Sequence, residues 1–410
     1  MDDKKHKSME RANELHVKGQ EFLIQRKDIA LGINSYYYEQ YRKAKEKIIR
    51  LLGANNQLWE QWEWQIENQI TSLDLLKLLI NFSMQEIEEI SSVSKKYRWS
   101  ITPYYAALIN ATKRSDPIRK MCVPSIEELI DNGMKDPTAE EYSNPVGGII
   151  RRYPDRVIMN ITNSCAGFCR HCQRKRNFGE TDSMLSNNAI DQSIEYIKNN
   201  TEIRDVLITG GDPLTLNNNE IEKIISRIRA IKHIEIIRIG TRTLVTMPQR
   251  INEELVSILK KYHPIFINTQ FNHPREITPE SQKACCMLRN AGIVLGNQMV
   301  LLKGINDDKY TVRLLNQELL KIGVKPYYIF HAKDVTGTKH FQSTIANGIE
   351  ILEYLQGNTS GLAIPRFIVS APEGKGKIPL QPNYILEETL NSIILKTWEN
   401  DIVSIPITQK

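Results

Sequence analysis

The sequence lacks the features that would place the chain in or across a membrane. No apolar run approaches the roughly 20 residues needed to span a bilayer, and the first residues, Met1 to Lys5, are charged where an export signal would be apolar. Neither sign of charge dominates: 54 Lys and Arg residues stand against 48 Asp and Glu residues, for a formal net charge of +6. This balance calls for no nucleic-acid partner, although the mild positive excess suits anionic ligands such as phosphate. We therefore expect a cytoplasmic protein without membrane or nucleic-acid contacts.

Cysteine is also scarce. Six cysteines in 410 residues do not suggest a disulfide framework in a chain of this size, and Cys165, Cys169 and Cys172 crowd into one short segment. This grouping indicates ligation of a metal or a cluster. Free cysteines elsewhere behave mostly as small buried apolar residues. The remaining three are therefore expected to be structural: Cys122, Cys285 and Cys286.

Residues 1–115 are predicted to form a helical region. Apolar residues recur at helical spacing around Leu76, and Ser72 and Ser83 are the residue type that caps the start of a helix. The charged stretch over residues 4–26 is typical of an exposed helix. It either packs on a partner subunit or on the main body, or is simply solvated, and the sequence leaves these alternatives open.

From Arg156 onward, short β-rich runs alternate with amphipathic helices, a pattern typical of a parallel sheet built from βα units. Six such units predict an α/β fold, a partial (β/α)6 TIM-like barrel, with functional residues at the carboxyl ends of its strands. The barrel is predicted over residues 116–345 and a C-terminal segment over residues 346–410. We expect strands at residues 157–162, 206–209, 234–239, 265–270, 294–301, 327–331 and 367–370, and helices that include residues 221–228 and 345–355.

The three grouped cysteines form a C-x3-C-x2-C motif directly after the first predicted barrel strand. Thiolates are the usual ligands of iron–sulfur clusters, and ferredoxin-type clusters take four of them. Here no fourth cysteine lies nearby in the sequence, which leaves one iron of a cubane open to a chelating ligand. The alternative is a zinc site made by the same cysteines with His171, because Cys3His sites are common.

The motif resembles that of the radical S-adenosylmethionine (SAM) superfamily, and the resemblance implies a [4Fe–4S] cluster on the three cysteines with SAM on the free iron. The second predicted strand ends in Gly210, Gly211 and Asp212. Alone, this segment is an ordinary turn. After the cysteine motif and one βα unit, it resembles the superfamily's glycine-rich motif, which implies contact with the amino group of SAM.

Lys377 stands in a glycine-rich turn near the carboxyl end, where a lysine with a lowered pKa can bond to an aldehyde cofactor. By itself the turn is more typical of a solvated basic loop. Together with four other segments it resembles the lysine 2,3-aminomutase family, in register over residues 136–384. The four segments are residues 151–157, 173–176, 268–274 and 296–302.

This resemblance implies pyridoxal 5′-phosphate (PLP) as a further cofactor and an isomerase that moves an amino group between the α and β carbons of an amino acid. It assigns Lys377 as the catalytic residue that holds PLP, with Arg152 and Arg156 contacting the coenzyme. Arg174 would pair with the α-carboxylate of the substrate. The family also implies a one-electron reductant of the flavodoxin or ferredoxin type, and we expect a homo-oligomer. Two glutamines would line the SAM pocket: Gln270 and Gln298.

The sequence departs from the family at three points. Glu373 and Lys375 interrupt the glycine run before Lys377, so Lys375 is a rival for the PLP lysine. Phe330 stands where the family often has a tyrosine near the coenzyme. The cysteines that bind an intersubunit zinc in lysine aminomutases are missing, with Asp308 at one of the positions, and we therefore expect no zinc.

Lys333 and Ser370 stand where lysine aminomutases place two aspartates around the distal ammonium of the substrate, and only a slip in register would put Asp334 there. Opposite charges ~4 Å apart are worth about 4 kcal/mol at an effective dielectric near 20, and exchanging one of them reverses the sign. The change favours an anionic substrate side chain, as in glutamate 2,3-aminomutases. We therefore expect interconversion of L-glutamate and β-glutamate, unless Lys333 points to solvent as most lysines do.

Two alternatives stay open. A lysine, arginine or protein-lysyl 2,3-aminomutase would share the cofactor residues and differ in what binds the distal end of the substrate. A non-catalytic metal-binding interaction protein would instead use the helical amino-terminal region, with zinc on the cysteines. Comparing the turnover of glutamate with that of lysine distinguishes the first alternative from a glutamate aminomutase. Zinc without iron, and no absorbance from bound coenzyme, would favour the second.

Overall fold

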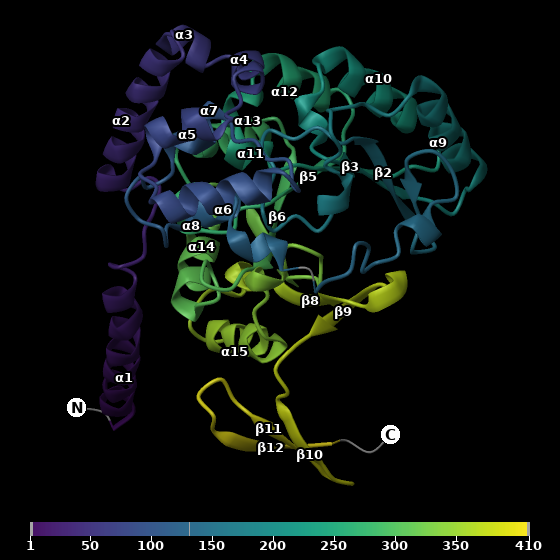
Figure 1. The fold of residues 1–410 in the computed structure, drawn as a ribbon. Helices are drawn as coiled ribbons and strands as arrows, with labels where there is room; N and C mark the ends of the chain where they lie inside the picture. The colour runs from purple at the N-terminus through teal and green to yellow at the C-terminus, as the bar shows by residue number, and fades with distance from the viewer. Residues whose placement is uncertain (1–2, 131, 408–410) are drawn as a thin grey trace.

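The computed structural model describes residues 3–130 and 132–407. Its centre is a nine-stranded sheet in which the strands follow one another in chain order (Figure 1). Strands β2 to β8 run parallel, while β1 and β9 pair antiparallel at the two edges. The strands are β1 (Ile149–Ile150), β2 (Arg156–Thr162), β3 (Asp205–Gly210), β4 (Ile236–Gly240), β5 (Ile265–Thr269), β6 (Val294–Leu301), β7 (Lys325–His331), β8 (Arg366–Ser370) and β9 (Lys377–Leu380).

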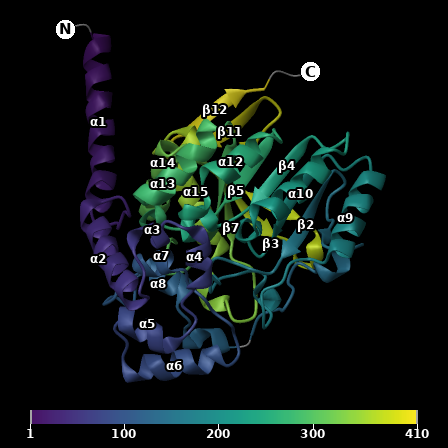
Figure 2. The same cartoon turned by 90° about the horizontal axis from the view of Figure 1, so that it is seen from above.

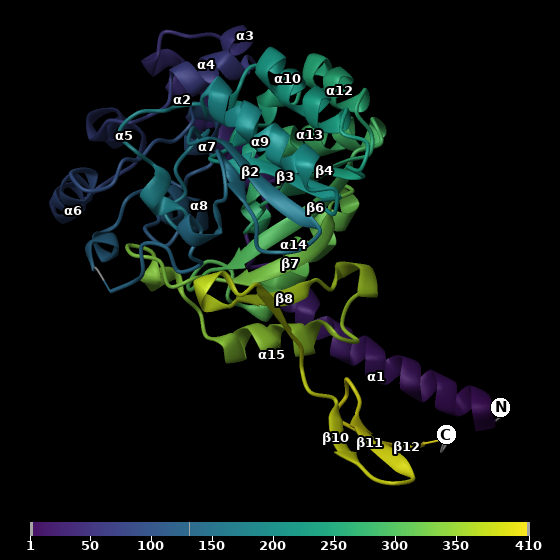
Figure 3. The same cartoon turned by 90° about the vertical axis from the view of Figure 1, so that its right-hand side faces the viewer.

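Helices cover the outside of this sheet, and the sheet stays an open barrel because β9 does not pair with β1 (Figure 3). The predicted partial barrel is confirmed: each predicted strand overlaps an observed one. The helix α10 follows an Asn217 cap and buries the isoleucines between Ile221 and Ile228 as predicted, and Asp308 caps α14. The helices are α9 (Asn187–Asn199), α10 (Asn218–Arg229), α11 (Thr243–Thr246), α12 (Glu253–Lys260), α13 (Pro279–Asn290), α14 (Lys309–Lys321) and α15 (Ile345–Leu355).

Alternation along each strand decides which side chains enter the barrel. In β4, Ile237 and Ile239 are buried in the hydrophobic core, whereas Arg238 between them lines the central cavity. Successive side chains of a strand point to opposite faces of the sheet. The same rule sets Val206 and Ile208 of β3 in the core and Leu207 between them on the cavity wall.

The region before the barrel is helical, as predicted, and lies along one side of it (Figure 2). Ser72 and Ser83 accept hydrogen bonds from the backbone N–H groups of Leu75 and Glu86, so both predicted caps are confirmed. The helices of this region are α1 (Asp3–Gln25), α2 (Ser35–Leu51), α3 (Asn56–Trp59), α4 (Trp62–Glu67), α5 (Leu73–Leu79), α6 (Met84–Ser94), α7 (Pro103–Ala107) and α8 (Pro117–Cys122).

Helix α1 extends away from the barrel, and only Phe22 is buried among its residues (Figure 1). Near it lies a second, three-stranded antiparallel sheet. Glu399 in this C-terminal part forms ion pairs with Arg11 and Lys18 of α1, so the charged helix contacts its own chain. The strands of the second sheet are β10 (Ile385–Glu388), β11 (Ser392–Lys396) and β12 (Ile402–Pro406).

The helical region and the barrel share one hydrophobic core, which runs from Tyr41 in α2 to Phe367 in β8. Strands β8 and β9 complete the sheet from beyond residue 345. The division of the chain at residues 115 and 345 stays a prediction. Among the helices of residues 3–130 and 132–407, none has the length and hydropathy to cross a membrane.

Candidate active site

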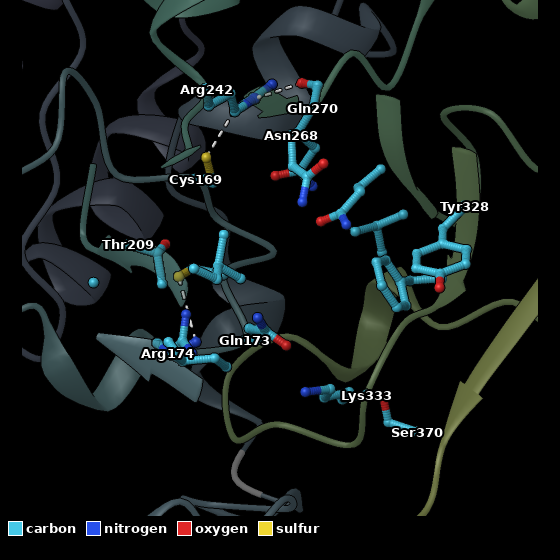
Figure 4. Close-up of a pocket in the computed structure, with 18 of the residues that line it drawn as sticks. Cys169, Gln173, Arg174, Thr209, Arg242, Asn268, Gln270, Tyr328, Lys333 and Ser370 are labelled. Carbon is cyan, nitrogen blue, oxygen red and sulfur yellow. Dashed lines mark hydrogen bonds between the residues drawn. The ribbon is translucent and has the colours of Figure 1, made fainter. Parts of the chain in front are cut away.

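A cavity of about 510 Å³ lies inside the open barrel and reaches the carboxyl ends of its parallel strands. All of the site residues predicted from the sequence line it, although they come from distant segments of the chain. Figure 4 shows five of them: Cys169, Arg174, Gln270, Lys333 and Ser370. This gathering is what the predicted roles require, and the roles themselves stay predictions. The residues are Arg152, Arg156, Cys165, Cys169, Cys172, Arg174, Gly210, Gly211, Asp212, Gln270, Gln298, Lys333, Ser370 and Lys377.

The helical N-terminal region holds the cysteine loop that follows β2. The backbone N–H of Phe168 donates to the carbonyl of Ser100 at 3.1 Å. Gln69 Nε2 donates to the carbonyl of Cys165 at 2.8 Å. The helical region is therefore a scaffold for the loop, a role that its helical periodicity alone does not reveal.

The three grouped cysteines are free thiols on the cavity wall. Burial raises the pKa of Cys165 well above its usual range and the pKa of Cys172 to about 11. Such thiols stay protonated at neutral pH, but a metal centre that binds them displaces the proton. Arg242 Nη1 donates to Cys169 Sγ at 2.7 Å, and the backbone N–H of Arg174 donates to Cys172 Sγ at 3.4 Å. Hydrogen bonds to the sulfurs of cluster ligands are among the features by which a protein tunes a cluster.

The zinc alternative fits this donor set poorly. Zinc needs its ligands around a single point, yet across residues 3–130 and 132–407 no three His, Cys, Asp or Glu side chains converge so as to hold one ion. His171 Nε2 instead lies 3.3 Å from Asn272 Nδ2. In a [4Fe–4S] cluster each thiolate binds a different iron, and three thiols that line one cavity suit such a cluster. Cys122 and Cys285 are buried, as predicted for structural cysteines, whereas Cys286 is half-buried.

The glycine-rich end of β3 packs against the start of the cysteine loop. A Cβ on Gly210 would lie 2.3 Å from the carbonyl oxygen of Thr162, and one on Gly211 would lie 2.2 Å from that of Ser164. Gly210 also has a φ of 137°, which side-chain-bearing residues rarely adopt. The glycines therefore let two backbone segments meet, in addition to lining the cavity.

Asp212 lines the cavity, but its carboxylate is already bonded within the protein. Thr241 Oγ1 and the backbone N–H of Arg242 each donate to it at 2.7 Å, and the backbone N–H of Leu214 donates at 3.1 Å. Burial nevertheless raises the pKa of Asp212. Asp212 thus fixes the loop that carries Arg242, and its contact with SAM stays a prediction.

Lys377 begins β9 and directs its ammonium to the aromatic side of the cavity. Lys377 Nζ lies 4.9 Å from the ring centroid of Tyr328 and 5.4 Å from that of Phe330. The pKa of Lys377 is lowered to about 8. Loss of hydration is the largest cause, and the positive charges of Arg238 and Arg156 act in the same direction. A free amine is therefore accessible near neutral pH, as a bond to an aldehyde requires.

Lys375 does not share this setting. It lies outside the cavity lining and pairs with Glu373 at 2.8 Å, a hydrogen bond that raises the pKa of Lys375. Between the two lysines, Gly376 has a φ of 102°, and the hydroxyl of Tyr153 accepts the backbone N–H of Lys377 at 2.9 Å. The turn therefore presents Lys377 to the cavity and Lys375 to solvent.

Lys333 and Ser370 lie at the same end of the sheet (Figure 4). Lys333 follows β7, Ser370 ends β8, and the two strands pair at Phe330 and Ile368. Lys333 lines the cavity whereas Asp334 does not, which is the arrangement that the predicted register requires. Lys333 is also not a solvent-facing lysine.

Neighbouring groups shift the pKa of Lys333 in opposite directions. Burial lowers the pKa of Lys333 to about 7, and the neighbouring Arg174, Arg152 and Lys377 act in the same direction. Glu140 opposes them. A carboxylate bound beside Lys333 would restore its proton, because an opposite charge favours the charged form of an amine.

Glu140 is a site residue that the sequence did not predict. Its carboxylate accepts Arg174 Nε at 3.0 Å, Arg174 Nη2 at 2.9 Å, Arg152 Nη2 at 2.8 Å and Arg176 Nη2 at 3.3 Å. Burial would raise the pKa of Glu140, but Arg174, with Arg152 and Lys333, outweighs burial and holds it at about 2. A glutamate in an irregular segment carries no periodic signal that could have marked it.

Two segments of the chain match known protein families, and both contain residues of the site. Residues 159–315 match the family model described as Radical SAM superfamily, and residues 352–409 match that described as Lysine-2,3-aminomutase. The chain is 50% identical to a glutamate 2,3-aminomutase of Clostridioides difficile, over 98% of this chain and 95% of that protein. It is 47% identical to an L-lysine 2,3-aminomutase of Acetoanaerobium sticklandii and 44% identical to one of Clostridium subterminale, in each case over 84% of both chains.

Proposed function

The chain belongs to the lysine 2,3-aminomutase family of radical SAM enzymes, and on that premise we propose that it interconverts L-glutamate and β-glutamate. It is an isomerase that uses a [4Fe–4S] cluster, SAM and PLP. The observation that carries glutamate as the substrate is the position of Lys333, a cation on the cavity wall at the end of β7 with Ser370 at the end of the neighbouring strand. A second carboxylate on the substrate complements that cation, and an ammonium does not.

Each group of cavity residues has a proposed part. When bound, the cluster and SAM supply a radical that removes hydrogen from the substrate, and PLP supplies the π system across which the amino group migrates. The protein binds and orients these groups and excludes water from them. We assign Cys165, Cys169 and Cys172 to the cluster, Gly210, Gly211, Asp212, Gln270 and Gln298 to SAM, and Lys377, Arg152 and Arg156 to PLP.

The substrate would be held at both of its ends. The planar guanidinium of Arg174 suits the α-carboxylate, because it can donate two parallel hydrogen bonds. Lys333 and Ser370 would receive the distal carboxylate. Arg174 and Lys333 both line the cavity, so glutamate would span between two cations with its reacting carbons in the middle.

A panel of amino acids tests the proposal. Anaerobically reconstituted enzyme is incubated separately with glutamate, lysine and aspartate, and the products are identified by NMR. We expect β-glutamate from glutamate, with a kcat/KM at least about 100-fold above that for lysine, because each 1.4 kcal/mol of charge discrimination is worth tenfold. Equal or faster turnover of lysine would show that glutamate is not the substrate.

The low pKa of Lys333 predicts a pH dependence. Below its pKa of about 7, Lys333 is charged and attracts the distal carboxylate, and as the pH rises through that value the free enzyme loses this charge. We expect kcat/KM for glutamate to fall above neutral pH by up to about tenfold per unit. Lys333→Arg should abolish the fall while keeping the preference for glutamate, since arginine stays charged. The same fall in Lys333→Arg would assign it to another group.

Arg242 should tune the cluster. Besides its contact with Cys169, its Nη2 donates to the hydroxyl of Tyr105 at 2.9 Å and pairs with buried Glu276, which holds the guanidinium in place. We expect Arg242→Gln to weaken iron retention against a chelator by at least about tenfold. Loss of a positive charge should also move the reduction potential of the cluster to more negative values. Unchanged iron retention and potential would leave Arg242 with a structural role only.

We also propose that the enzyme is cytoplasmic, takes its electron from a flavodoxin or ferredoxin, and works as a homo-oligomer. The free state of its six cysteines suits a reducing compartment. The second sheet exposes several apolar side chains that another subunit could cover. These include Ile385, Leu386, Leu390, Ile402 and Ile405.

A further inference from the structure

Residues 133–143 form a strap that links the two parts of the proposed substrate site. At one end, Met134 pairs with Val335, two residues after Lys333, and Thr336 Oγ1 donates to the carbonyl of Gly133 at 2.7 Å. At the other end, the strap lies so close to the lysine turn that a Cβ on Gly374 would be 2.9 Å from the carbonyl oxygen of Thr138. The strap thus contacts both the loop of Lys333 and the turn of Lys377.

The strap directs Glu140 into the cavity. Ala139, directly before it, has a φ of 48°, a left-handed conformation that side-chain-bearing residues rarely adopt. The carbonyl of Ala139 accepts the hydroxyl of Ser143 at 3.0 Å, and the backbone N–H of Ser143 donates to the carbonyl of Glu140 at 3.1 Å. Glu140 is only 5% exposed, so a closed turn fixes its carboxylate among the arginines.

Glu140 binds one edge of the Arg174 guanidinium and leaves the Nη1 side without a bond to it. A guanidinium has five N–H donors in a rigid plane, and the edge formed by Nε and Nη2 binds the two oxygens of Glu140. Within residues 3–130 and 132–407, no acceptor is bonded to Nη1 of Arg174. A second carboxylate can therefore bind Arg174 on the Nη1 side while Glu140 holds the plane of the guanidinium.

We infer that Glu140 is a positioning residue of the substrate site: it orients Arg174 for the α-carboxylate and offsets the charges of Arg152, Arg174 and Lys333. This inference rests on the proposed function. Without the carboxylate, Arg174 loses its bidentate anchor. The charged groups that face Lys333 would then be Arg174, Arg152 and Lys377, all of them cations that oppose its proton.

The first test compares three variants of the holoenzyme. We expect Glu140→Gln to raise the KM for glutamate at least about tenfold with a smaller change in kcat, and to move the pH at which KM rises downward by about one unit. Glu140→Asp, which keeps the charge and guards against a folding defect, should partly restore both. Glu141→Gln is the matched control, because that neighbouring carboxylate is 75% exposed, and it should behave as wild type. Iron content and coenzyme absorbance should not change in any of them.

An unchanged KM and pH profile in Glu140→Gln would overturn the inference. A lowered KM would also overturn it, because it would mean that Glu140 competes with the substrate for Arg174.

The second test needs no turnover. Reductive methylation reacts with the neutral amine, so the pH dependence of labelling at Lys333, followed by mass spectrometry without substrate, reports its protonation. We expect the midpoint to lie about one unit lower in Glu140→Gln than in wild type. A shifted midpoint in a protein that does not convert glutamate would sink the proposed function and keep the inference. An unshifted midpoint in a protein that does convert glutamate would overturn the inference and leave the proposed function standing.

Discussion

Lys333→Asp is expected to exchange the substrate preference of the enzyme from glutamate to lysine. The substitution puts a carboxylate where the cavity now offers an ammonium, at the end of β7. An attraction between unit charges at ~4 Å is worth about 4 kcal/mol at an effective dielectric near 20, and the substitution replaces it with a repulsion of similar size. The ratio of kcat/KM for glutamate to that for lysine should therefore fall by at least about a thousandfold. Steady-state kinetics on both amino acids measure the ratio.

Asp334→Asn is the matched control for this exchange. Asp334 adjoins Lys333 but does not line the cavity, and its Oδ1 lies 3.8 Å from Lys339 Nζ. Its substitution should leave the ratio of kcat/KM values as in wild type. If Lys333→Asp also leaves the ratio unchanged, Lys333 does not contact the substrate, and the argument for glutamate from cavity charge is lost.

Lys377→Met is expected to lower kcat by at least about a thousandfold and to remove the visible absorbance of covalently bound PLP. The lowered pKa of Lys377, about 8, and its place beside Tyr328 suit it to bind an aldehyde. The cluster should be unaffected, because the cysteine loop lies after β2 and not beside β9. Iron analysis and the absorbance spectrum separate the two effects.

Lys375→Met provides the comparison, since Lys375 lies two residues away in the same turn but outside the cavity lining and is paired with Glu373. This variant should keep both the absorbance and the activity. A loss of absorbance in Lys375→Met with retention in Lys377→Met would reverse the assignment of the PLP lysine.

Much of the barrel follows from local patterns in the sequence. The isoleucines from Ile221 to Ile228 predict α10 because helical spacing puts them on one buried face. Strand alternation is also enough to place Arg238 on the cavity side. Arg238 stands between Ile237 and Ile239, so its side chain points to the face of the sheet opposite to these buried isoleucines. The edge strand β1 escaped prediction because it is only two residues long, and β10 and β12 of the second sheet because they are exposed along their length and lack a clear apolar alternation.

The candidate site divides in the same way. Cys165 stands in a compact motif whose spacing carries chemical meaning. The assignment of Lys377 depends instead on the family resemblance of the segments around it, because its turn alone is typical of a solvated loop. Glu140 and Arg242 could not be predicted, because their importance lies in contacts across the fold, to Arg174 and to Cys169. Such contacts depend on which strand ends meet, and no local pattern specifies the side chains that meet there.

The most direct test of the account follows the nitrogen of glutamate. Wild-type enzyme, reconstituted with iron, sulfide and PLP and reduced in the presence of SAM, is given fully 13C,15N-labelled L-glutamate mixed with unlabelled L-glutamate. The account predicts β-glutamate in which 15N is bonded only to the central 13C of the same labelled molecule, seen as a one-bond coupling by NMR. No β-glutamate, or 15N scrambled onto unlabelled carbon, would contradict it.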